Sequence, residues 1–302
     1  AQESRGLGDV YKRQIMNNNI DFTFYSGNDT YEAMTSSSEI MPLLVADNYD
    51  DVLQNGSSPA YLHHLSSNRK SLIDWYPFDE NASLLEIGAE SGILTSVFCQ
   101  KLKSVTATDP NKCYCEANAL RNKKVDNLSI YAGSFLNINF NTAYDYITFI
   151  GSLDTPLSEK YIQKAVSLLN PNGSLIIACP NTYGLKYFSG VPENYSKRLF
   201  EGIQGYPNEE HYCSFSINGL KKLLNSNGLS CQHFYYPIPD YEYPTELFSD
   251  NRLPSSGSIR YPAYSYSSRR TELFNEVLAF DKICEDDMFP IFANSFLVFA
   301  NR

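Results

Sequence analysis

A glycine turn separates an apolar run from a segment of helical pattern. The run at 83–88 (SLLEIG) ends in Gly88, and Gly92 opens the helical pattern of 92–103 (GILTSVFCQKLK). At such a turn, backbone N–H groups and the positive end of the helix can face a ligand, and glycine's missing Cβ lets that ligand come close. This pattern is typical of sites that bind nucleotide-like molecules.

An acidic residue follows the turn at the spacing expected for a ribose. Asp109 comes 21 residues after Gly88 and directly follows the strand-like segment 104–108 (SVTAT). A separation of about 20 residues is usual for a carboxylate that accepts hydrogen bonds from ribose hydroxyls. A nicotinamide-type G-x-G-x-x-G would need glycine where Glu90 and Ile93 stand, so a dinucleotide site is the poorer fit.

Alternating strand-like and helical segments must position these residues. Strands are expected at 83–88, 104–108, 128–132, 144–150, 173–179, 229–236 and 294–300, with helices at 61–75, 92–103, 112–124, 157–169 and 215–225. Alternation of this kind predicts an α/β fold, a doubly wound parallel sheet with helices on both faces.

The segment 85–95 (LEIGAESGILT) resembles motif I of the class I, Rossmann-like S-adenosylmethionine-dependent methyltransferases. The resemblance implies a mostly parallel seven-stranded sheet with an antiparallel last strand, and an enzyme of the methyltransferase class (EC 2.1.1 type) that uses S-adenosyl-L-methionine. It also implies the cofactor-binding residues Glu86, Gly88, Ala89, Glu90, Gly92, Asp109, Pro110, Gly133, Ser134, Ile150 and Gly151.

Glu90 is the departure from that motif, because the family has glycine there. A side chain at the middle of the turn takes up room and suits a positive φ poorly, and its charge lies near a ligand that bears a carboxylate. The ligand also has an ammonium and a sulfonium, which a carboxylate attracts. We expect the steric cost to dominate, so that Glu90→Gly binds the cofactor more tightly.

Beyond the cofactor half, segments such as 69–78 (RKSLIDWYPF) and 234–250 (FYYPIPDYEYPTELFSD) resemble a bacterial methyltransferase group associated with glycosyltransferases and surface-polysaccharide assembly. The resemblance implies O-methylation of a small or saccharide acceptor in glycan biosynthesis, with a glycosyltransferase as a partner. A hydroxyl acceptor needs a base. The candidate catalytic residues are His211, Asp240 and Glu193, and Lys186 and Arg198 are candidates to meet an anionic acceptor.

The expected domain organisation has three parts. We expect residues 1–14 to be a non-native leader and residues 15–60 a loosely packed N-terminal extension. Residues 61–302 are expected to form the methyltransferase domain, with substrate-side insertions near 181–214 and 237–290.

Composition excludes several function classes. The chain of 302 residues has a formal net charge of −10, and this negative charge argues against binding to nucleic acids or to anionic membrane surfaces. No apolar run is long enough to span a bilayer and no secretion signal is evident, so a cytoplasmic location is expected. Seven cysteines contain no C-x-x-C pair, so no metal site is expected.

The hypothesis that competes with a methyltransferase is a SAM-fold module without catalysis that docks to a glycosyltransferase-type partner.

Overall fold

The computed structural model describes residues 20–47, 49–55, 58–193, 196–208, 212–263 and 270–302. The chain forms two compact units, Ala1–Thr148 and Phe149–Arg302, and each is described by itself. Residues 1–14, expected to be a leader, lie outside the described residues, as does His211.

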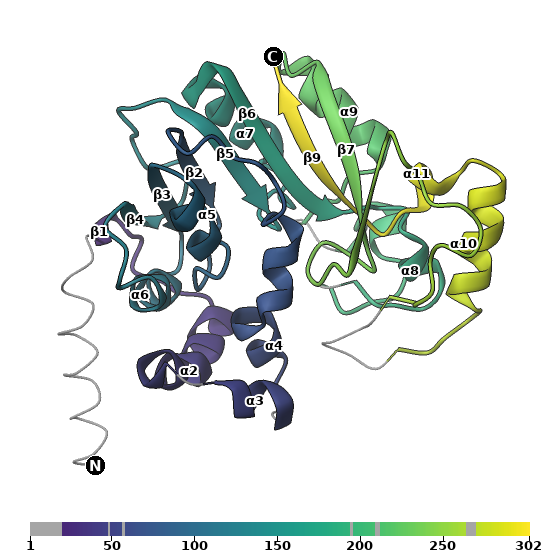
Figure 1. Cartoon of the computed structure of the whole chain (residues 1–302), viewed down its shortest axis with the longest axis horizontal. Coiled ribbons are helices and arrows are strands. Elements are labelled where there is room, and N and C mark those ends of the chain that lie inside the picture. Colours follow the sequence, from purple (N-terminus) through teal and green to yellow (C-terminus); the bar gives the residue numbers. More distant parts are fainter. Residues whose placement is uncertain (1–19, 48, 56–57, 194–195, 209–211, 264–269) are drawn as a thin grey trace. The chain divides into compact units, whose positions relative to one another are not determined.

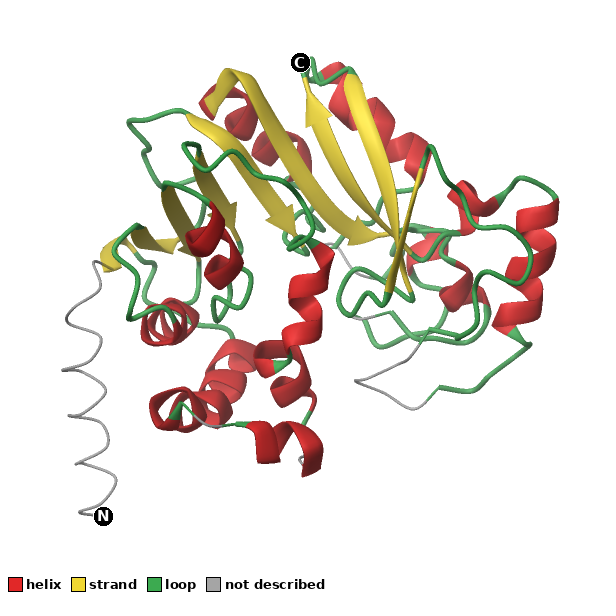
Figure 2. Ribbon diagram, viewed as in Figure 1, coloured by secondary structure: helices red, strands yellow, loops and turns green. Residues whose placement is uncertain are grey.

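The first unit contains a parallel sheet whose strands run in the order β1-β4-β3-β2. Its strands are β1 (Ile20–Phe24), β2 (Ser83–Ile87), β3 (Ser104–Asp109) and β4 (Leu128–Gly133), and β5 (Tyr144–Ile150) crosses into the second unit. Its helices are α2 (Tyr31–Ala46), α3 (Asp50–Asn55), α4 (Pro59–Leu65), the 3-10 helix η1 (Ser67–Leu72), α5 (Thr95–Lys101) and α6 (Lys112–Arg121). Strands and helices alternate from β2 to β4, as expected (Figures 1 and 2).

The second unit arranges its strands in the order β6-β9-β7-β8, with every recorded pair antiparallel. The strands are β6 (Leu169–Pro180), β7 (Cys231–Ile238), β8 (Glu246–Ser249) and β9 (Ser295–Asn301). Helical segments are α7 (Ser158–Leu168), α8 (Leu185–Phe188), η2 (Gly202–Gln204), α9 (Ile217–Ser226), α10 (Glu276–Glu285) and α11 (Phe289–Phe292). Because β6 and β7 each run antiparallel to β9, they point the same way and end at the same edge.

The α/β Rossmann-like fold with an antiparallel last strand is confirmed, but the expected number of seven strands is wrong. The described residues contain nine, and the two additional strands are β1 and β8. β1 pairs with β4 and β8 pairs with β7. Neither had been predicted, because one is a short run in a polar region and the other lies in a segment rich in Pro and Tyr.

The part of the expected N-terminal extension that the structure describes is packed, which corrects the expectation of loose packing. Helix α2 contacts α6 and α4, and Ile40 and Leu44 are buried against Ala117 and Leu120 of α6. The Asp29 carboxylate accepts hydrogen bonds from backbone N–H groups in the first turn of α6, at 2.7 and 3.1 Å. The segment therefore stabilises the helix that follows Asp109.

No described helix of either unit is both long enough and apolar enough to cross a bilayer.

Candidate functional site

The glycine turn connects β2 to the segment that leads into α5, and three of its residues have a positive φ. The φ values are 77° for Gly88, 47° for Glu90 and 80° for Gly92. A Cβ on Gly92 would lie 2.2 Å from the Asn118 side-chain oxygen, so glycine is required there for packing against α6 as well as for its conformation.

Backbone N–H groups of the turn bond to the neighbouring strand. The Gly88 and Ala89 N–H groups donate to the Thr108 carbonyl at 2.9 and 3.0 Å, and the Glu90 N–H donates to Asp109 Oδ2 at 3.1 Å. The expectation that these groups face a ligand is therefore wrong for all three. The turn continues the pairing of β2 with β3, and this pairing fixes its path.

Asp109 is the last residue of β3 and is buried. Its Oδ1 accepts hydrogen bonds from the Asn111 backbone N–H at 2.8 Å and the Asn111 side chain at 3.1 Å. Burial raises the pKa of Asp109 to about 7, although these hydrogen bonds oppose the rise. Pro110 separates Asp109 from Asn111, which precedes α6.

Glu86 is a second buried carboxyl group beneath the turn. Its Oε2 accepts a hydrogen bond from Thr95 Oγ1 at 2.5 Å, and Thr95 accepts one from the Asn118 side chain at 3.0 Å. Burial raises the pKa of Glu86 to about 8, and the charges of Glu90 and Asp109 add to the rise. The turn thus brings three carboxyl groups close enough to oppose one another's ionisation.

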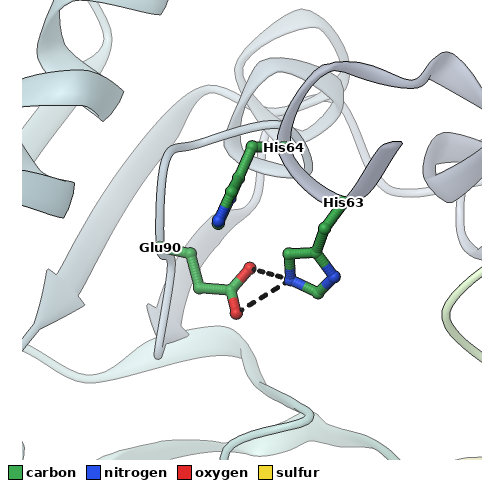
Figure 3. A group of neighbouring side chains, drawn as sticks. All are labelled: His63, His64 and Glu90. Atoms are coloured by element: carbon green, nitrogen blue, oxygen red, sulfur yellow. Dashed lines mark hydrogen bonds and ion pairs between the residues drawn. The ribbon is translucent and has the colours of Figure 1, made fainter. Parts of the chain in front are cut away.

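The Glu90 carboxylate is held by two residues from the elements before β2. Its Oε2 lies 2.9 Å from the Arg69 guanidinium and 2.9 Å from His63 Nε2, and Figure 3 draws the contact with His63. Burial alone would raise the pKa of Glu90, but the charges of His63 and Arg69 hold it well below its ordinary value. Arg69 also donates to the His63 carbonyl at 3.2 Å and is itself buried.

His64 completes this group as a neutral ring. Its Nδ1 lies 3.0 Å from Ser91 Oγ and its Nε2 lies 3.4 Å from the Tyr114 hydroxyl. Burial lowers the pKa of His64 to about 3, so the ring is uncharged at neutral pH.

Donor atoms of His63, His64 and Glu90 lie within 4.8 Å of one another, a spacing that a metal ion could use. A guanidinium nitrogen of Arg69 already lies 3.0 Å from His63 Nε2 and 2.9 Å from Glu90 Oε2. The arrangement therefore favours the guanidinium as the cation of this group, and the absence of a metal stays a prediction.

Gly133 and Ser134 follow β4 in the first unit. Gly133 has a φ of 153°, and a Cβ there would lie 2.6 Å from the Phe24 carbonyl. The glycine is thus required by the approach of β1. The assignment of Gly133 and Ser134 to the cofactor site stays a prediction.

Ile150 and Gly151 lie in the second unit, at the end of β5. Gly151 has a φ of 71° and donates from its backbone N–H to the Ala178 carbonyl at 2.8 Å. A Cβ on Gly151 would lie 3.1 Å from the Tyr241 hydroxyl, so this side chain closes over the end of β5.

Asp240 and Glu193, two of the candidate catalytic residues, share an electrostatic partner in Lys186. Lys186 Nζ lies 3.5 Å from Asp240 Oδ2, and both side chains are buried. Asp240 Oδ1 accepts backbone hydrogen bonds from Glu242 at 3.0 Å and Tyr243 at 3.3 Å.

Glu193 has both carboxylate oxygens engaged. Oε1 accepts the Gly202 backbone N–H at 3.2 Å, and Oε2 accepts the Tyr206 hydroxyl at 3.1 Å. Burial raises the pKa of Glu193, while the Lys186 charge opposes the rise. These contacts favour a role in holding the loop rather than in taking a proton from a substrate.

The other candidates differ in what the structure says of them. His211 lies outside the described residues. Arg198 is exposed and lies 3.9 Å from Glu201, in contrast to the buried Lys186. Arg69 and His63 were not predicted as partners of the turn. The signal was Glu90 itself, because a carboxylate placed among other carboxyl groups needs a nearby cation.

Comparisons with known proteins identify the family. Residues 61–233 match the family described as a methyltransferase domain. An uncharacterized methyltransferase of Staphylococcus carnosus is 27% identical over 183 residues, which cover 60% of this chain and 85% of that protein. The malonyl-[acyl-carrier protein] O-methyltransferase of Priestia megaterium is 31% identical over 160 residues, half of this chain and 51% of that protein, so the chain spans about half of its length.

Among solved structures, the CcbJ methyltransferase of Streptomyces caelestis aligns with a TM-score of 0.47 at 13% identity, covering 86% of this chain and 98% of that one. None of these comparisons supports the hypothesis of a non-catalytic docking module. The matched family spans more than half of the chain, including the turn at Gly88 and Asp109, and the chain belongs to the S-adenosylmethionine-dependent methyltransferases.

Proposed function

We propose that this methyltransferase transfers a methyl group to a hydroxyl oxygen of a small acceptor, with a saccharide as the acceptor class. The observation that carries the proposal is the buried Lys186–Asp240 pair, which places a carboxylate oxygen at the edge where β6 and β7 end. Ligands of doubly wound folds bind at the carboxyl ends of the strands. A carboxylate there supplies the proton acceptor that a hydroxyl requires.

The carboxyl groups around the turn fit the charge of the cofactor. Glu86, Glu90 and Asp109 raise the energy of one another's ionised forms, so a cationic ligand relieves their repulsion. We assign Asp109 to the ribose hydroxyls and Glu86 to the ammonium group. When bound, S-adenosylmethionine supplies a methyl carbon that its positive sulfur has already activated.

The raised pKa values predict that cofactor binding releases protons. The pKa of Glu86 is about 8 and that of Asp109 about 7, so both groups hold protons in the free protein at pH 6. A cationic ligand prefers the ionised forms, and the affinity should therefore rise from pH 6 to pH 8.5, by roughly tenfold or more since one pKa unit corresponds to a factor of ten.

Calorimetric titration in two buffers of different ionisation enthalpy measures both effects. Binding at pH 6.5 should be accompanied by proton release to the buffer. An affinity that stays constant over this pH range, with no buffer dependence of the heat, would show that neither carboxyl group responds to the ligand.

Alignment and proton transfer are the contributions of the second unit. The displacement needs the acceptor oxygen held in line and water excluded. Tyr241 covers the end of β5 at Gly151, and Lys186 fixes the orientation of Asp240. We therefore assign Asp240 as the general base in preference to Glu193. Both Glu193 oxygens accept hydrogen bonds, whereas Asp240 accepts its two backbone hydrogen bonds on Oδ1 and its Oδ2 lies in an ion pair with Lys186 at 3.5 Å.

The saccharide class rests on the resemblance to methyltransferases associated with glycosyltransferases, and a glycosyltransferase partner is part of the same proposal. Transfer to oxygen also agrees with the name of the Priestia megaterium relative, an O-methyltransferase. Tyr183 is 41% exposed and is therefore available to stack on a sugar ring, whereas Tyr236 is fully buried and donates to Asp250 at 2.7 Å.

The test is methyl transfer from labelled S-adenosylmethionine to a panel of free sugars, nucleotide sugars, uronic acids and primary amines. We expect label on a sugar in a form that survives mild alkali, because an ether is stable there and a methyl ester is not. Label confined to amines, or label lost in alkali, would refute the hydroxyl acceptor and leave the methyltransferase activity intact.

A further inference from the structure

Glu90 has a conformation that its own side chain does not favour. Its φ of 47° lies in the left-handed region, which residues other than glycine occupy infrequently and at a cost. The side chain is held from outside the turn, by His63 of α4 and Arg69 of η1. These contacts hold the Glu90 carboxylate against the Arg69 guanidinium, which therefore already acts as a carboxylate-binding site.

The amino-acid end of the cofactor needs such a site. It carries a carboxylate next to an ammonium. Glu86, Glu90 and Asp109 around the turn suit the ammonium, and the carboxylate needs one of the basic groups that also border the turn. Arg121, the other guanidinium near the turn, donates to the backbone carbonyls of Ser91 and His64. Of these two arginines, Arg69 is the one that binds a carboxylate in the described residues, that of Glu90, and its side chain is buried.

A guanidinium beside a histidine suits a ligand carboxylate for the same reasons that it suits Glu90. Hydrogen bonds between charged partners are stronger than those between neutral ones, and burial strengthens them further. When a ligand carboxylate approaches Arg69, a guanidinium nitrogen is therefore already paired with Glu90 Oε2, which lies 2.9 Å from it.

We propose that Arg69 and His63 form the subsite for the cofactor's carboxylate, and that Glu90 occupies this subsite in the free protein as an internal competitor. The inference rests on the cofactor assignment above and adds a role for the residue that departs from the motif. The ligand carboxylate must displace Glu90 from Arg69, which lowers the apparent affinity. Once displaced, Glu90 lies near the ligand's ammonium, which it attracts.

The proposal predicts opposite effects on two ligands. S-adenosylhomocysteine carries the carboxylate and the ammonium, and its decarboxylated analogue keeps only the ammonium. If Glu90 leaves Arg69 available about one tenth of the time, Glu90→Gln removes a competition worth about tenfold in S-adenosylhomocysteine affinity. This gain should exceed the loss of one partly exposed attraction to the ammonium, so binding tightens. The same substitution should weaken binding of the decarboxylated analogue. That ligand loses the attraction between its ammonium and Glu90, and it has no carboxylate to use the vacated Arg69.

The measurement is calorimetric titration of both ligands into wild type, Glu90→Gln and Glu90→Gly, with thermal unfolding of each protein recorded. Glu80→Gln is the matched control, because it makes the same chemical change at an exposed position of the same unit and should leave both affinities unchanged. Should Glu90→Gln fail to fold, Glu90→Gly carries the comparison with the same two expected signs.

Weaker binding of S-adenosylhomocysteine by the variants would overturn the proposal and make Glu90 a direct ligand of the ammonium. Equal changes for both ligands would overturn it as well, because the effect would then be independent of the carboxylate. If neither ligand binds wild type or variant, the cofactor assignment itself falls, a result that differs from both of these.

Discussion

Replacement of Asp240 by asparagine is expected to lower kcat by about 10²–10⁴, the usual contribution of a general base, with little change in cofactor affinity. The amide keeps an oxygen for the Glu242 and Tyr243 backbone N–H groups, so the local turn should persist. It removes the carboxylate oxygen that lies 3.5 Å from Lys186 Nζ and with it the proton acceptor. Steady-state kinetics with the acceptor that the panel of sugars and amines identifies measures the effect.

Asp250→Asn is the matched control. Asp250 lies in the same unit and its carboxylate likewise accepts a backbone N–H, from Phe234 at 2.9 Å, together with the Tyr236 hydroxyl. The control variant should retain wild-type kcat. If Asp240→Asn also retains it, Asp240 is a structural partner of Lys186 and the base must be sought elsewhere, with His211 the remaining candidate.

Lys186→Met separates the positioning role from the charge. The variant removes the cation that lies 3.5 Å from Asp240 Oδ2 and leaves the backbone hydrogen bonds to Oδ1 in place. We expect kcat to fall while the cofactor affinity stays unchanged, and Lys186→Arg, which keeps the cation, should recover part of the lost kcat. A purely structural contact would instead lower the melting temperature and leave the kcat of the folded protein unchanged.

The buried strands of this fold could be predicted because they are short apolar runs between turns. The strand expected at 144–150 has the observed bounds of β5, and that expected at 83–88 differs from β2 by one residue. Apolar side chains occupy most positions of both, which is the pattern of strands covered by helices on two faces.

The elements before residue 60 could not be predicted in the same way. Helix α2 buries only Ala33, Ser37, Ile40 and Leu44, so one small and one polar residue occupy half of its inward face. Its stability comes from packing against α6, about seventy residues later in the chain, and not from its own pattern. Strand β1 likewise depends on β4, which offers it an edge.

The candidate site was predictable where its residues follow one another in a motif. Spacing along the chain identifies Gly88 and Asp109, because one strand and one helix separate them. Arg69 and His63 have no such periodic relation to the turn, and only the packing of α4 and η1 brings them to Glu90. The meaning of Glu90 changes accordingly, from a steric obstacle to a carboxylate with defined partners.

Asp109 has opposite effects on folding and on binding. Its pKa is about 7 in the folded protein and about 3.9 in an unfolded chain, so between these values the unfolded state loses a proton that the folded state keeps. The free energy of unfolding therefore falls as the pH rises from about 4 to 7, and the loss remains above pH 7. One pKa unit corresponds to about 1.4 kcal/mol, so the loss amounts to a few kcal/mol at most.

Asp109→Asn should consequently stabilise the free protein at pH 8 and weaken its binding of S-adenosylmethionine. The neutral amide avoids the cost of a buried charge and keeps an oxygen for the Asn111 N–H, 2.8 Å away in the wild type. Its NH2 group replaces Oδ2 and cannot accept the Glu90 N–H, but one lost hydrogen bond, about 1 kcal/mol, costs less than the buried charge. It loses hydrogen bonds from ribose hydroxyls to a charged acceptor, worth roughly 1.5–3 kcal/mol, or about 10- to 150-fold in affinity. Asp109→Ala should bind S-adenosylmethionine at least as weakly as Asp109→Asn but without the gain in stability, because it leaves the Asn111 and Glu90 N–H groups unpaired.

Thermal unfolding at pH 5 and pH 8 measures the stability of each variant, and calorimetric titration measures its affinity for the cofactor. At pH 5 the stabilisation by asparagine should shrink, since wild-type Asp109 is then protonated in the folded protein. An Asp109→Asn protein that is less stable than wild type at pH 8 but binds the cofactor equally well would make Asp109 a structural residue of the turn and remove it from the ribose site.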